Sequence, residues 1–271
     1  MLGVSAAARV AVVVVLAAVV AFPIYTSFVS ALTVNGEVAR HGLLPGLGSL
    51  TLANFAEVSR SVDLVPQYLV SIAVVTLQTL AQVATGALAA YALVFPRWRG
   101  KGLAFALVLL TLAIPGESIV IPNYELVSAI GLRDTVLGVA LPYLAAGYPI
   151  FLLRQAFAGV PLEIWEASRL DGAGDLRSLV EVILPACRPE VTTAVVWSAL
   201  SAWNGFFWPL LITDSSSSRT IQVGISQLAA SEASDPSVLF AGTVLVVLPT
   251  MLLVVLAQRL LVNGLARGVL H

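Results

Sequence analysis

The chain has 271 residues, of which 59% are hydrophobic and 11% are charged, and its mean hydropathy is +0.96. Soluble domains carry about 25% charged residues, so the composition excludes a soluble globular domain and indicates a polytopic membrane protein. The formal net charge of −1 gives no reason to expect a nucleic-acid partner. Cys187 is the only cysteine, and His41 and His271 lie far apart in sequence, so we predict neither a disulfide nor a metal site.

The first predicted membrane span is 10–32. Arg9 precedes a neutral run from Val10 to Gly36, which exceeds the about 20 residues that a spanning helix needs. The alternative is a cleaved signal peptide, because Val29-Ser30-Ala31 resembles a small-x-small cleavage site. The run is long for the apolar part of a signal peptide, so we favour the span.

Three further spans are predicted between residues 68 and 153. The mixed segment 33–67 predicts a loop with a short amphipathic helix around 52–60. The neutral segment after it predicts a second span at 68–95, and small residues near Gly86 favour close helix packing. A basic turn at 97–101 separates it from a third span, and a fourth span follows a short loop. We place these two spans at 102–122 and 135–153.

Glu117 interrupts the third predicted span. A carboxylate inside a membrane segment is a functional hypothesis by default. An unbroken helix from Gly102 would place Glu117 about 23 Å along its axis, in the outer part of the bilayer. Two interpretations therefore stay open: Glu117 lines a substrate path, or it is a structural or interfacial residue.

The segment 160–189 is the most charged part of the chain, and long hydrophobic runs flank it. Bilayer segments do not carry this charge density, so it is a water-exposed loop. Pro161 suits a helix start, and Asp171-Gly172 is a turn signal, which predicts a first short helix over 162–170. A second short helix is predicted over 175–183, with Pro185 ending it.

The last third of the chain contains the fifth and sixth predicted spans, 191–212 and 236–257, with a serine-rich loop at 214–235 between them. Trp203-Asn204 and the aromatic residues after it stand near the end of the fifth span. Aromatic faces and an amide suit a sugar ring, but the same residues suit the aromatic belt at a membrane interface.

Six spans put both termini on one side of the membrane. Four basic residues then fall on the other side: Arg40, Arg60, Arg133 and Arg219. The remaining ten of the 14 Lys and Arg residues share the side of the termini and of the loop 160–189. The positive-inside rule therefore predicts that the termini and this loop are cytoplasmic.

The charged loop resembles the E-A-A-x3-G-x9-I-x-L-P loop of permease subunits of binding-protein-dependent ABC importers, carbohydrate-uptake type. Ser168 and Val182 depart from that pattern and keep its size class. The resemblance implies an all-α ABC importer type I permease fold, a single domain over 1–271, with a coupling helix between spans 4 and 5. It also implies these residues for coupling to the ATPase: Glu166, Ala167, Ser168, Asp171, Gly172, Val182, Leu184 and Pro185.

Two further segments are similar to the sugar permeases of this family. Pro115, Pro122 and Tyr124 resemble I-P-x5-P-x-Y, with six residues between the two prolines here, and Trp203-Asn204 begins a match to W-N-x4-P-L. The candidate residues for a substrate path are Glu117, Asn123, Tyr124, Trp203 and Asn204. The resemblance leaves oligosaccharides, monosaccharides, polyols and glycerol-3-phosphate open as solutes.

The resemblance also implies the partners: a homologous second permease, two ATPase subunits, an extracytoplasmic binding protein and membrane lipid. The chain lacks a G-x-x-x-x-G-K-[ST] sequence, so ATP and Mg²⁺ are expected on the ATPase and no cofactor or enzymatic activity on this chain. The competing class is an ion-coupled secondary transporter or channel that uses Glu117. A membrane scaffold without transport activity is a third class.

Overall fold

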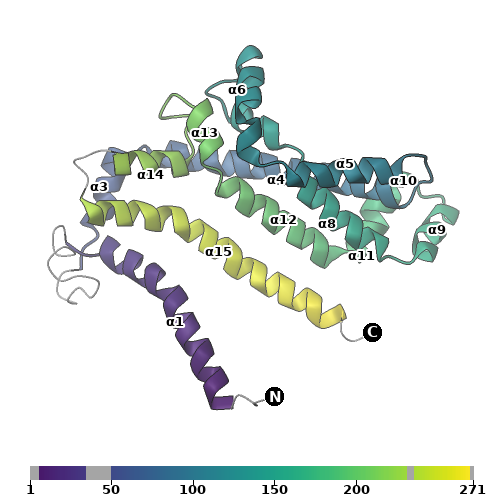
Figure 1. Cartoon of the computed structure of the whole chain (residues 1–271), viewed down its shortest axis with the longest axis horizontal. Coiled ribbons are helices and arrows are strands. Elements are labelled where there is room, and N and C mark those ends of the chain that lie inside the picture. Colours follow the sequence, from purple (N-terminus) through teal and green to yellow (C-terminus); the bar gives the residue numbers. More distant parts are fainter. Residues whose placement is uncertain (1–5, 35–49, 231–234, 269–271) are drawn as a thin grey trace. The chain divides into compact units, whose positions relative to one another are not determined.

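The computed structural model describes residues 6–34, 50–230 and 235–268 (Figure 1). The described residues are helical, and their one β-bridge pairs Thr33 with Leu50. The chain divides into two compact units. One comprises 1–64 with 224–249, and the other comprises 65–223 with 250–271.

The first unit contains α1 (Ala6–Ala31), α3 (Ala53–Ser61), most of α14 (Ile221–Ala230) and the start of α15 (Pro236–Gly268). Helix α3 confirms the predicted short amphipathic helix. The buried Asn54 amide donates to the carbonyl oxygens of Ala31 and Thr33, at 2.9 and 2.8 Å. These carbonyls lie at and just beyond the last turn of α1, where the helix leaves acceptors unpaired. Asn54 thus fixes α3 to the end of α1.

Three described helices are long and apolar enough to cross a membrane: Val10–Ala31, Leu64–Val94 and Pro236–Gln258. Their positions agree with the first, second and sixth predicted spans. Up to five spans result if two bent helix pairs each count as one. The structure therefore agrees with a helical protein that crosses the membrane several times. Among the described residues, however, helix length and composition identify at most five spans, and six were predicted.

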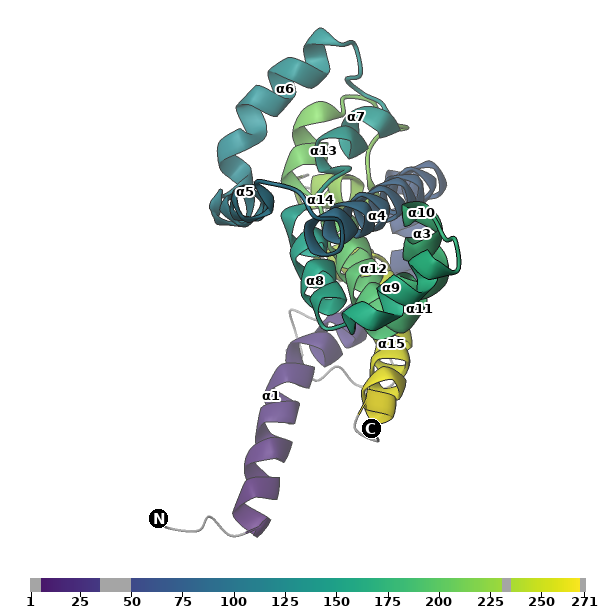
Figure 2. The same cartoon turned by 90° about the vertical axis from the view of Figure 1, so that its right-hand side faces the viewer.

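The third predicted span is broken. Helix α5 (Lys101–Ala113) ends at Ile114-Pro115, and the chain turns through 98° into η1 (Gly116–Ile119) and α6 (Val120–Ala129). Figure 2 shows α5 nearly end-on, with α6 leading away from it. Pro115 lacks the N–H that would continue the helix ladder. Glu117 follows this break, so the 23 Å estimate, which assumed an unbroken helix, does not apply.

The fourth predicted span is also bent. Helix α7 (Val136–Ala140) and η2 (Leu141–Tyr143) meet α8 (Gly147–Ala158) at 47°. Gly147 permits the close contact of α8 with α5, because a Cβ there would lie 2.5 Å from the Thr111 hydroxyl. On the other side of α8, Gly86 of α4 (Leu64–Val94) faces Pro149, at 3.2 Å from the position of an added Cβ.

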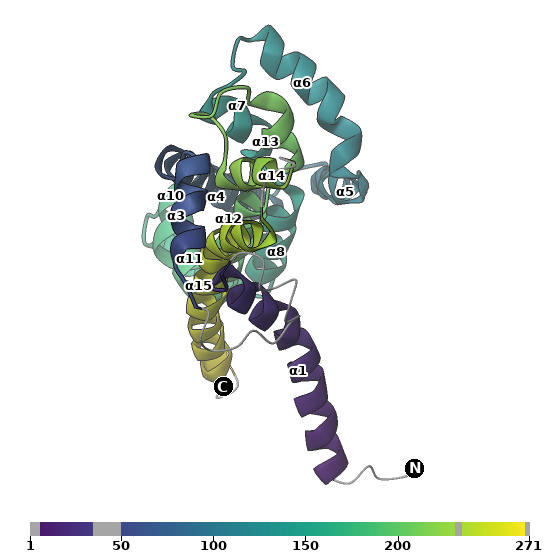
Figure 3. The same ribbon diagram turned by 90° about the vertical axis from the view of Figure 1, so that its left-hand side faces the viewer.

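The fifth predicted span consists of α12 (Arg188–Trp203) and α13 (Phe207–Ile212), which are separated by Asn204–Phe206. Neither helix is long enough to count as a span. Helix α12 packs along α8 (Figure 1), and α13 lies beside α7 (Figure 3). The Asp134 carboxylate accepts hydrogen bonds from the backbone N–H groups of Asp214 and Ser215, at 2.8 and 3.0 Å. This contact ties the loop before α7 to the loop after α13.

The second unit contains two buried apolar clusters. One joins α4, α8 and the segment after α9 (Leu162–Leu170), through residues such as Tyr91, Phe95, Phe157 and Ile183. The other joins α4, α6, α7 and α13, through Val74, Val120, Val139, Trp208 and Ile212. Helix α4 runs through both clusters. A candidate site lies next to each of them.

Candidate functional site

The charged loop folds as two short helical arms. Helix α9 spans Leu162–Leu170, as predicted, and the second arm comprises α10 (Asp175–Ser178), η3 (Leu179–Ile183) and α11 (Leu184–Ala186). We call residues 162–186 the elbow. Its residues are held by the end of α4 and by contacts between the two arms.

Helix α9, the first arm of the elbow, is anchored at the end of α4 by aromatic side chains. The indole N–H of Trp165 donates to the Tyr91 hydroxyl at 2.8 Å, and this hydroxyl donates to the Asp175 carboxylate at 3.2 Å. The Trp165 ring also stacks on Phe95, with 5.7 Å between ring centroids. Both arms are therefore bonded to one residue of α4, Tyr91.

Two serines close the inside of the elbow. Ser168 and Ser178 are both buried, their hydroxyl oxygens lie 2.9 Å apart, and Ser168 also donates to the Trp165 carbonyl at 2.7 Å. The family resemblance implied both Ala167 and Ser168 for coupling to the ATPase. The structure exposes Ala167 and turns Ser168 inward. Ser168 therefore holds the arms together.

The arms meet at a glycine turn. Gly172 has φ of +81°, a conformation that costs other residues roughly 1–2 kcal/mol. The Ala173 N–H donates to the Ser168 carbonyl at 3.0 Å, which ends α9, and Arg169 pairs with Asp175 at 3.1 Å across the turn. An added Cβ at Gly172 would meet no atom of the chain within 4 Å, so glycine is required here by the backbone and not by packing within the described residues.

Pro185 does not end the second arm at Ile183, as the sequence analysis expected. The Leu184 N–H donates to the Leu179 carbonyl, five residues back, and the helix continues to Ala186. In this wider turn a backbone N–H bonds the carbonyl five residues back instead of four. The regular helical hydrogen-bond pattern is therefore already interrupted next to Pro185, which lacks an N–H, and the helix accommodates the proline. Val182 and Leu184 pack against the buried cluster of Tyr91 and Phe157, so they support the elbow from inside.

The outer surface of the elbow carries apolar side chains that the sequence analysis did not select. Leu170 is 90% exposed, and Leu176 is 65% exposed. Leu162, Ile164 and Val180 are exposed nearby, together with Glu166, Asp171 and Gly172. The sequence did offer a signal for this surface, because Leu170 and Leu176 stand on either side of the predicted turn at Asp171-Gly172. Exposed apolar residues rimmed by charges are typical of a surface that another protein covers.

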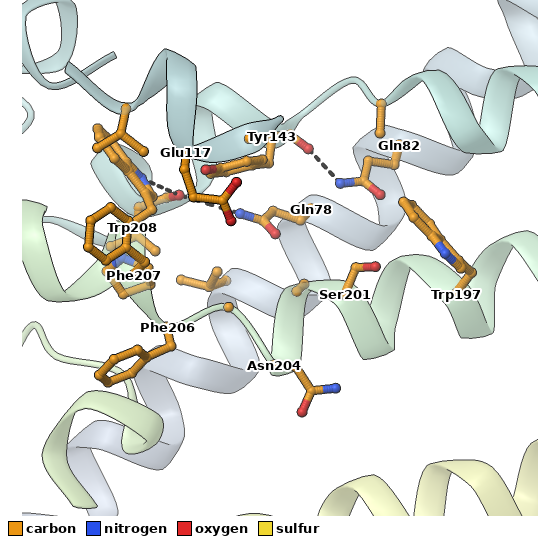
Figure 4. A pocket seen from close by; sticks show the side chains of 18 residues that line it. Gln78, Gln82, Glu117, Tyr143, Trp197, Ser201, Asn204, Phe206, Phe207 and Trp208 are labelled. Atoms are coloured by element: carbon orange, nitrogen blue, oxygen red, sulfur yellow. Dashed lines mark hydrogen bonds between the residues drawn. The ribbon is translucent and has the colours of Figure 1, made fainter. Parts of the chain in front are cut away.

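A pocket of about 500 Å³ lies beside the breaks of the third, fourth and fifth predicted spans (Figure 4). We call it the Glu117 pocket. Its volume is within the range of small-molecule sites. Its polar and aromatic lining residues include Gln78, Gln82, Glu117, Tyr143, Trp197, Ser201, Asn204, Phe206, Phe207 and Trp208.

Hydrogen bonds from neighbouring elements occupy carbonyl groups at the bend of the fourth span. The Gln82 amide donates to the Tyr143 carbonyl at 2.7 Å, and the Gln78 amide lies 3.4 Å from the Val139 carbonyl. The Trp208 indole N–H also donates to the Val139 carbonyl, at 3.1 Å. Irregular backbone inside a membrane protein needs such partners, because lipid supplies none. These bonds tie α7 and η2 to α4 and α13.

The structure brings together two of the five candidate path residues. Glu117 and Asn204 both line the Glu117 pocket. Asn204 donates its amide to the Leu200 carbonyl at 2.8 Å, and in Figure 4 this amide is directed away from the Glu117 side chain. Asn204 therefore uses its donor within its own helix.

The other three candidates lie elsewhere. Tyr124 packs on the apolar cluster of α6 and α13 beneath Arg133, 5.2 Å from the ring centroid. Trp203 is buried against Tyr68, and Asn123 is half-buried on α6. The described residues that line the pocket include none of these three.

Sequence reasoning missed the glutamines of α4. Gln67, Ser71, Gln78 and Gln82 are all buried and recur at intervals of four and seven residues, which places them on one helix face. A polar stripe on an apolar spanning helix was the available signal. Within the described residues, no group of His, Cys, Asp and Glu side chains is arranged to hold a metal ion.

Residues 82–267 match the family described as binding-protein-dependent transport system inner membrane component. Over 256 residues the chain is 31% identical to the sn-glycerol-3-phosphate transport system permease protein UgpE of Brucella suis biovar 1 (strain 1330), with 91% of each chain covered. It is 28% identical over 260 residues to the arabinooligosaccharides transport system permease protein AraQ of Halalkalibacterium halodurans, covering 93% of this chain and 92% of the relative.

The fold is similar to that of a chain in a crystal structure of a bacterial ABC transporter involved in the import of the acidic polysaccharide alginate. The TM-score is 0.81, and the match covers 96% of this chain and 99% of that chain. The sequence identity of the pair is 21%, so the likeness concerns the fold.

Proposed function

Because this chain belongs to the family of binding-protein-dependent transport system inner membrane components, we propose that it is a permease subunit of an ATP-driven ABC importer for a sugar or related polar solute. It forms the translocation path with a second, homologous permease. Two ATPase subunits drive the cycle from the cytoplasm, and an extracytoplasmic binding protein delivers the solute. Nucleotide and Mg²⁺ bind to the ATPase subunits, and this chain contributes no catalytic residue.

The observation that carries this proposal is the architecture of the elbow. Its buried side holds the two arms in one geometry through Ser168, Ser178 and Trp165. Its exposed side presents Leu170 and Leu176 to a partner. In the proposed cycle the ATPase docks on this exposed side. Closure of the ATPase dimer displaces the elbow, and Tyr91 and Phe95 transmit the displacement to α4, which also lines the Glu117 pocket.

The solute path is proposed to include the Glu117 pocket. The names of the curated relatives refer to sn-glycerol-3-phosphate and to arabinooligosaccharides. Both solutes carry hydroxyl groups, and the pocket offers aromatic faces with amide and carboxylate groups. Such a lining suits hydroxylated solutes, through stacking and hydrogen bonds.

The orientation rests on the charge distribution. We place the elbow, the basic turn 97–101 and both termini in the cytoplasm, and the loop 214–235 outside. Cysteines introduced as Arg99→Cys and Ser217→Cys in a Cys187→Ala background test this, because positions 99 and 217 are exposed. An impermeant thiol reagent on intact cells should label position 217 and spare position 99. The reverse pattern would overturn the orientation.

The test of the function is ATPase capture. Leu170→Ser should reduce co-purification of the ATPase and solute-stimulated ATP hydrolysis by about tenfold or more, because the loss of a buried leucine anchor costs a few kcal/mol. Leu126→Ser is the matched control, since Leu126 is 60% exposed on α6. Equal capture by the parent and Leu170→Ser would remove the elbow as the docking surface.

The competing function is an ion-coupled transporter that uses Glu117. Uptake into proteoliposomes separates the two. The proposal requires uptake that depends on the ATPase and on ATP and that an ionophore leaves unchanged. Uptake without the ATPase that an ionophore abolishes would establish the competitor.

A further inference from the structure

The Glu117 pocket has an unusual balance of hydrogen-bonding groups. Gln82 is 3% exposed, its amide nitrogen is bonded to the Tyr143 carbonyl at 2.7 Å, and its side-chain oxygen is buried without a hydrogen-bond partner. A buried acceptor without a partner costs about 1–3 kcal/mol, so a donor that reaches it is favoured. This oxygen is shielded from solvent, so it belongs to the wall of the pocket and not to its open face.

Glu117 adds a second acceptor to the same wall. It stands in η1, directly after the 98° bend, and its carboxylate interacts electrostatically with the Tyr143 hydroxyl. Figure 4 shows its side chain directed into the pocket, on the side of Gln78 and Tyr143. The bend is what aims this residue, because an unbroken helix would carry it away along the axis of α5.

No positive charge balances this carboxylate in the part of the chain that the structure describes. The 18 residues that line the pocket include one carboxylate and no lysine, arginine or histidine. The nearby Arg133 is engaged by Asp214 at 2.8 Å and by the Tyr124 ring. Anion-binding sites use arginine, lysine or a group of backbone N–H donors. The wall supplied by this chain offers the opposite arrangement.

We infer that Glu117 is a specificity-determining residue, which makes the pocket favour uncharged, hydroxyl-rich solutes and disfavour phosphorylated or carboxylated ones. The inference rests on the proposed function, since it assigns the solute class of the same pocket. Hydroxyl groups of a solute can donate to the exposed Glu117 carboxylate. A phosphate or carboxylate group would face Glu117 as a like charge in a wall of low polarity, where repulsion is poorly screened.

The inference separates this chain from the solutes that some similar proteins are named for. Glycerol-3-phosphate and alginate are anionic, and both names appear among the relatives and fold neighbours. A permease that carried such solutes through this pocket would need cationic groups from its partner subunit. The charge selectivity of the pocket is therefore the quantity to measure.

The experiment uses a cysteine as a probe of local potential. Ser201 lines the pocket, its side chain is exposed, and cysteine has nearly the same shape. Ser201→Cys in the Cys187→Ala background is purified in the assembled importer. It is then modified by two methanethiosulfonate reagents of similar size, the cationic trimethylammonium-ethyl and the anionic sulfonato-ethyl compound. Each rate is divided by the rate with a small free thiol, which removes intrinsic reactivity.

The normalised rate should be about tenfold higher for the cationic reagent, because a cleft with one sign of charge concentrates the opposite ion by at least this factor. Glu117→Gln should bring the ratio close to one, and Glu117→Asp should retain it. Glu125→Gln is the matched control, since Glu125 is an exposed carboxylate on α6 that does not line the pocket, and it should leave the ratio unchanged.

A ratio near or below one in the parent would overturn the inference, and so would a ratio that Glu117→Gln does not change. The measurement needs no transport and no ATP hydrolysis. A failure of the proposed function would appear as absent ATP-dependent uptake with the charge ratio intact. A failure of this inference would appear as intact uptake with no charge ratio.

Discussion

The elbow and the Glu117 pocket use polar side chains in opposite ways. In the elbow, the polar pair Ser168 and Ser178 is buried and fully used inside the loop, and apolar residues such as Leu170 face outward. In the pocket, the polar residues Gln82 and Glu117 line a cavity together with Val74, Val120 and Val139 of an apolar cluster. This difference agrees with the roles we propose, a protein partner for the elbow and a small polar solute for the pocket.

The largest expected effect is at the turn of the elbow. Gly172→Leu forces a side chain into a backbone conformation with φ of +81° and adds volume to an exposed surface. We expect it to abolish ATPase association while the protein still inserts, and Glu166→Ala to weaken association. Co-purification of the ATPase is the measurement.

Gly172→Asn separates the two causes of that effect. Asparagine tolerates this conformation better than leucine, so it mainly adds volume. If Gly172→Asn binds the ATPase like the parent, backbone strain alone explains the leucine variant. Parent-like association in both the leucine and asparagine variants would show that the turn does not touch the ATPase.

In the pocket, Glu117→Ala should reduce uptake per assembled complex by about tenfold or more, because hydrogen bonds to charged groups contribute about 1.5–3 kcal/mol. Asn204→Ala should reduce it by about threefold or less, since its amide is bonded to its own helix at Leu200. Uptake is normalised to the amount of complex. The reverse ranking would assign the solute contact to Asn204.

Gln82→Leu tests whether the pocket wall depends on buried hydrogen bonds. The variant leaves the Tyr143 carbonyl without its bond from Gln82, and we expect a loss of about 1–3 kcal/mol in stability. Thr192→Val is the control, because the Thr192 hydroxyl bonds only its own helix, at the Arg188 carbonyl. Thermal unfolding of the purified complex is the assay, and equal midpoints for both variants would contradict the interpretation.

A smaller effect is expected inside the elbow. Ser168→Ala removes one partner of the buried serine pair and should cost about 1 kcal/mol, and Ser168→Ala with Ser178→Ala should cost less than the sum of the single changes. A double-mutant cycle on thermal stability measures this coupling. Additive effects would show that the 2.9 Å contact contributes nothing.

Thiol reagents applied to the parent chain are expected to have the smallest effect on function, because its one cysteine, Cys187, should react slowly. Burial, with a contribution from the nearby Glu190 carboxylate, raises the pKa of Cys187 to about 11. At pH 8 the thiolate fraction is then about one in a thousand, and it grows about tenfold for each pH unit towards pH 11. Modification at pH 8 should be at least about a hundredfold slower than at a cysteine introduced as Ser217→Cys. Comparable rates would show that Cys187 is accessible.

The elbow could be predicted from the sequence because its determinants are local. Pro161 and Asp171-Gly172 bound α9 at the residues where the structure begins and ends it. The inward position of Ser168 was not predictable, because its partner Ser178 belongs to the other arm. Sequence periodicity within one helix carries no information about such a pair.

The pocket was only partly predictable, because contacts between distant residues form it. The broken spans had visible prolines, but hydropathy alone reads a bent pair of helices as one continuous span. Gln78 and Gln82 bond residues 61 positions later in the chain. Glu117 was selected because a carboxylate stands out in an apolar run, whereas neutral glutamines did not.

The glutamine stripe of α4 has a consequence for biosynthesis. Amides at positions 78 and 82 obtain their acceptors only when residues 139–143 have been made and inserted. Until then α4 carries amides without these acceptors, and it is less apolar than the spans Val10–Ala31 and Pro236–Gln258. Burying such groups in hydrocarbon alone is unfavourable. Helix α4 should therefore remain beside the insertion machinery after translation and enter the lipid together with α7 and α8.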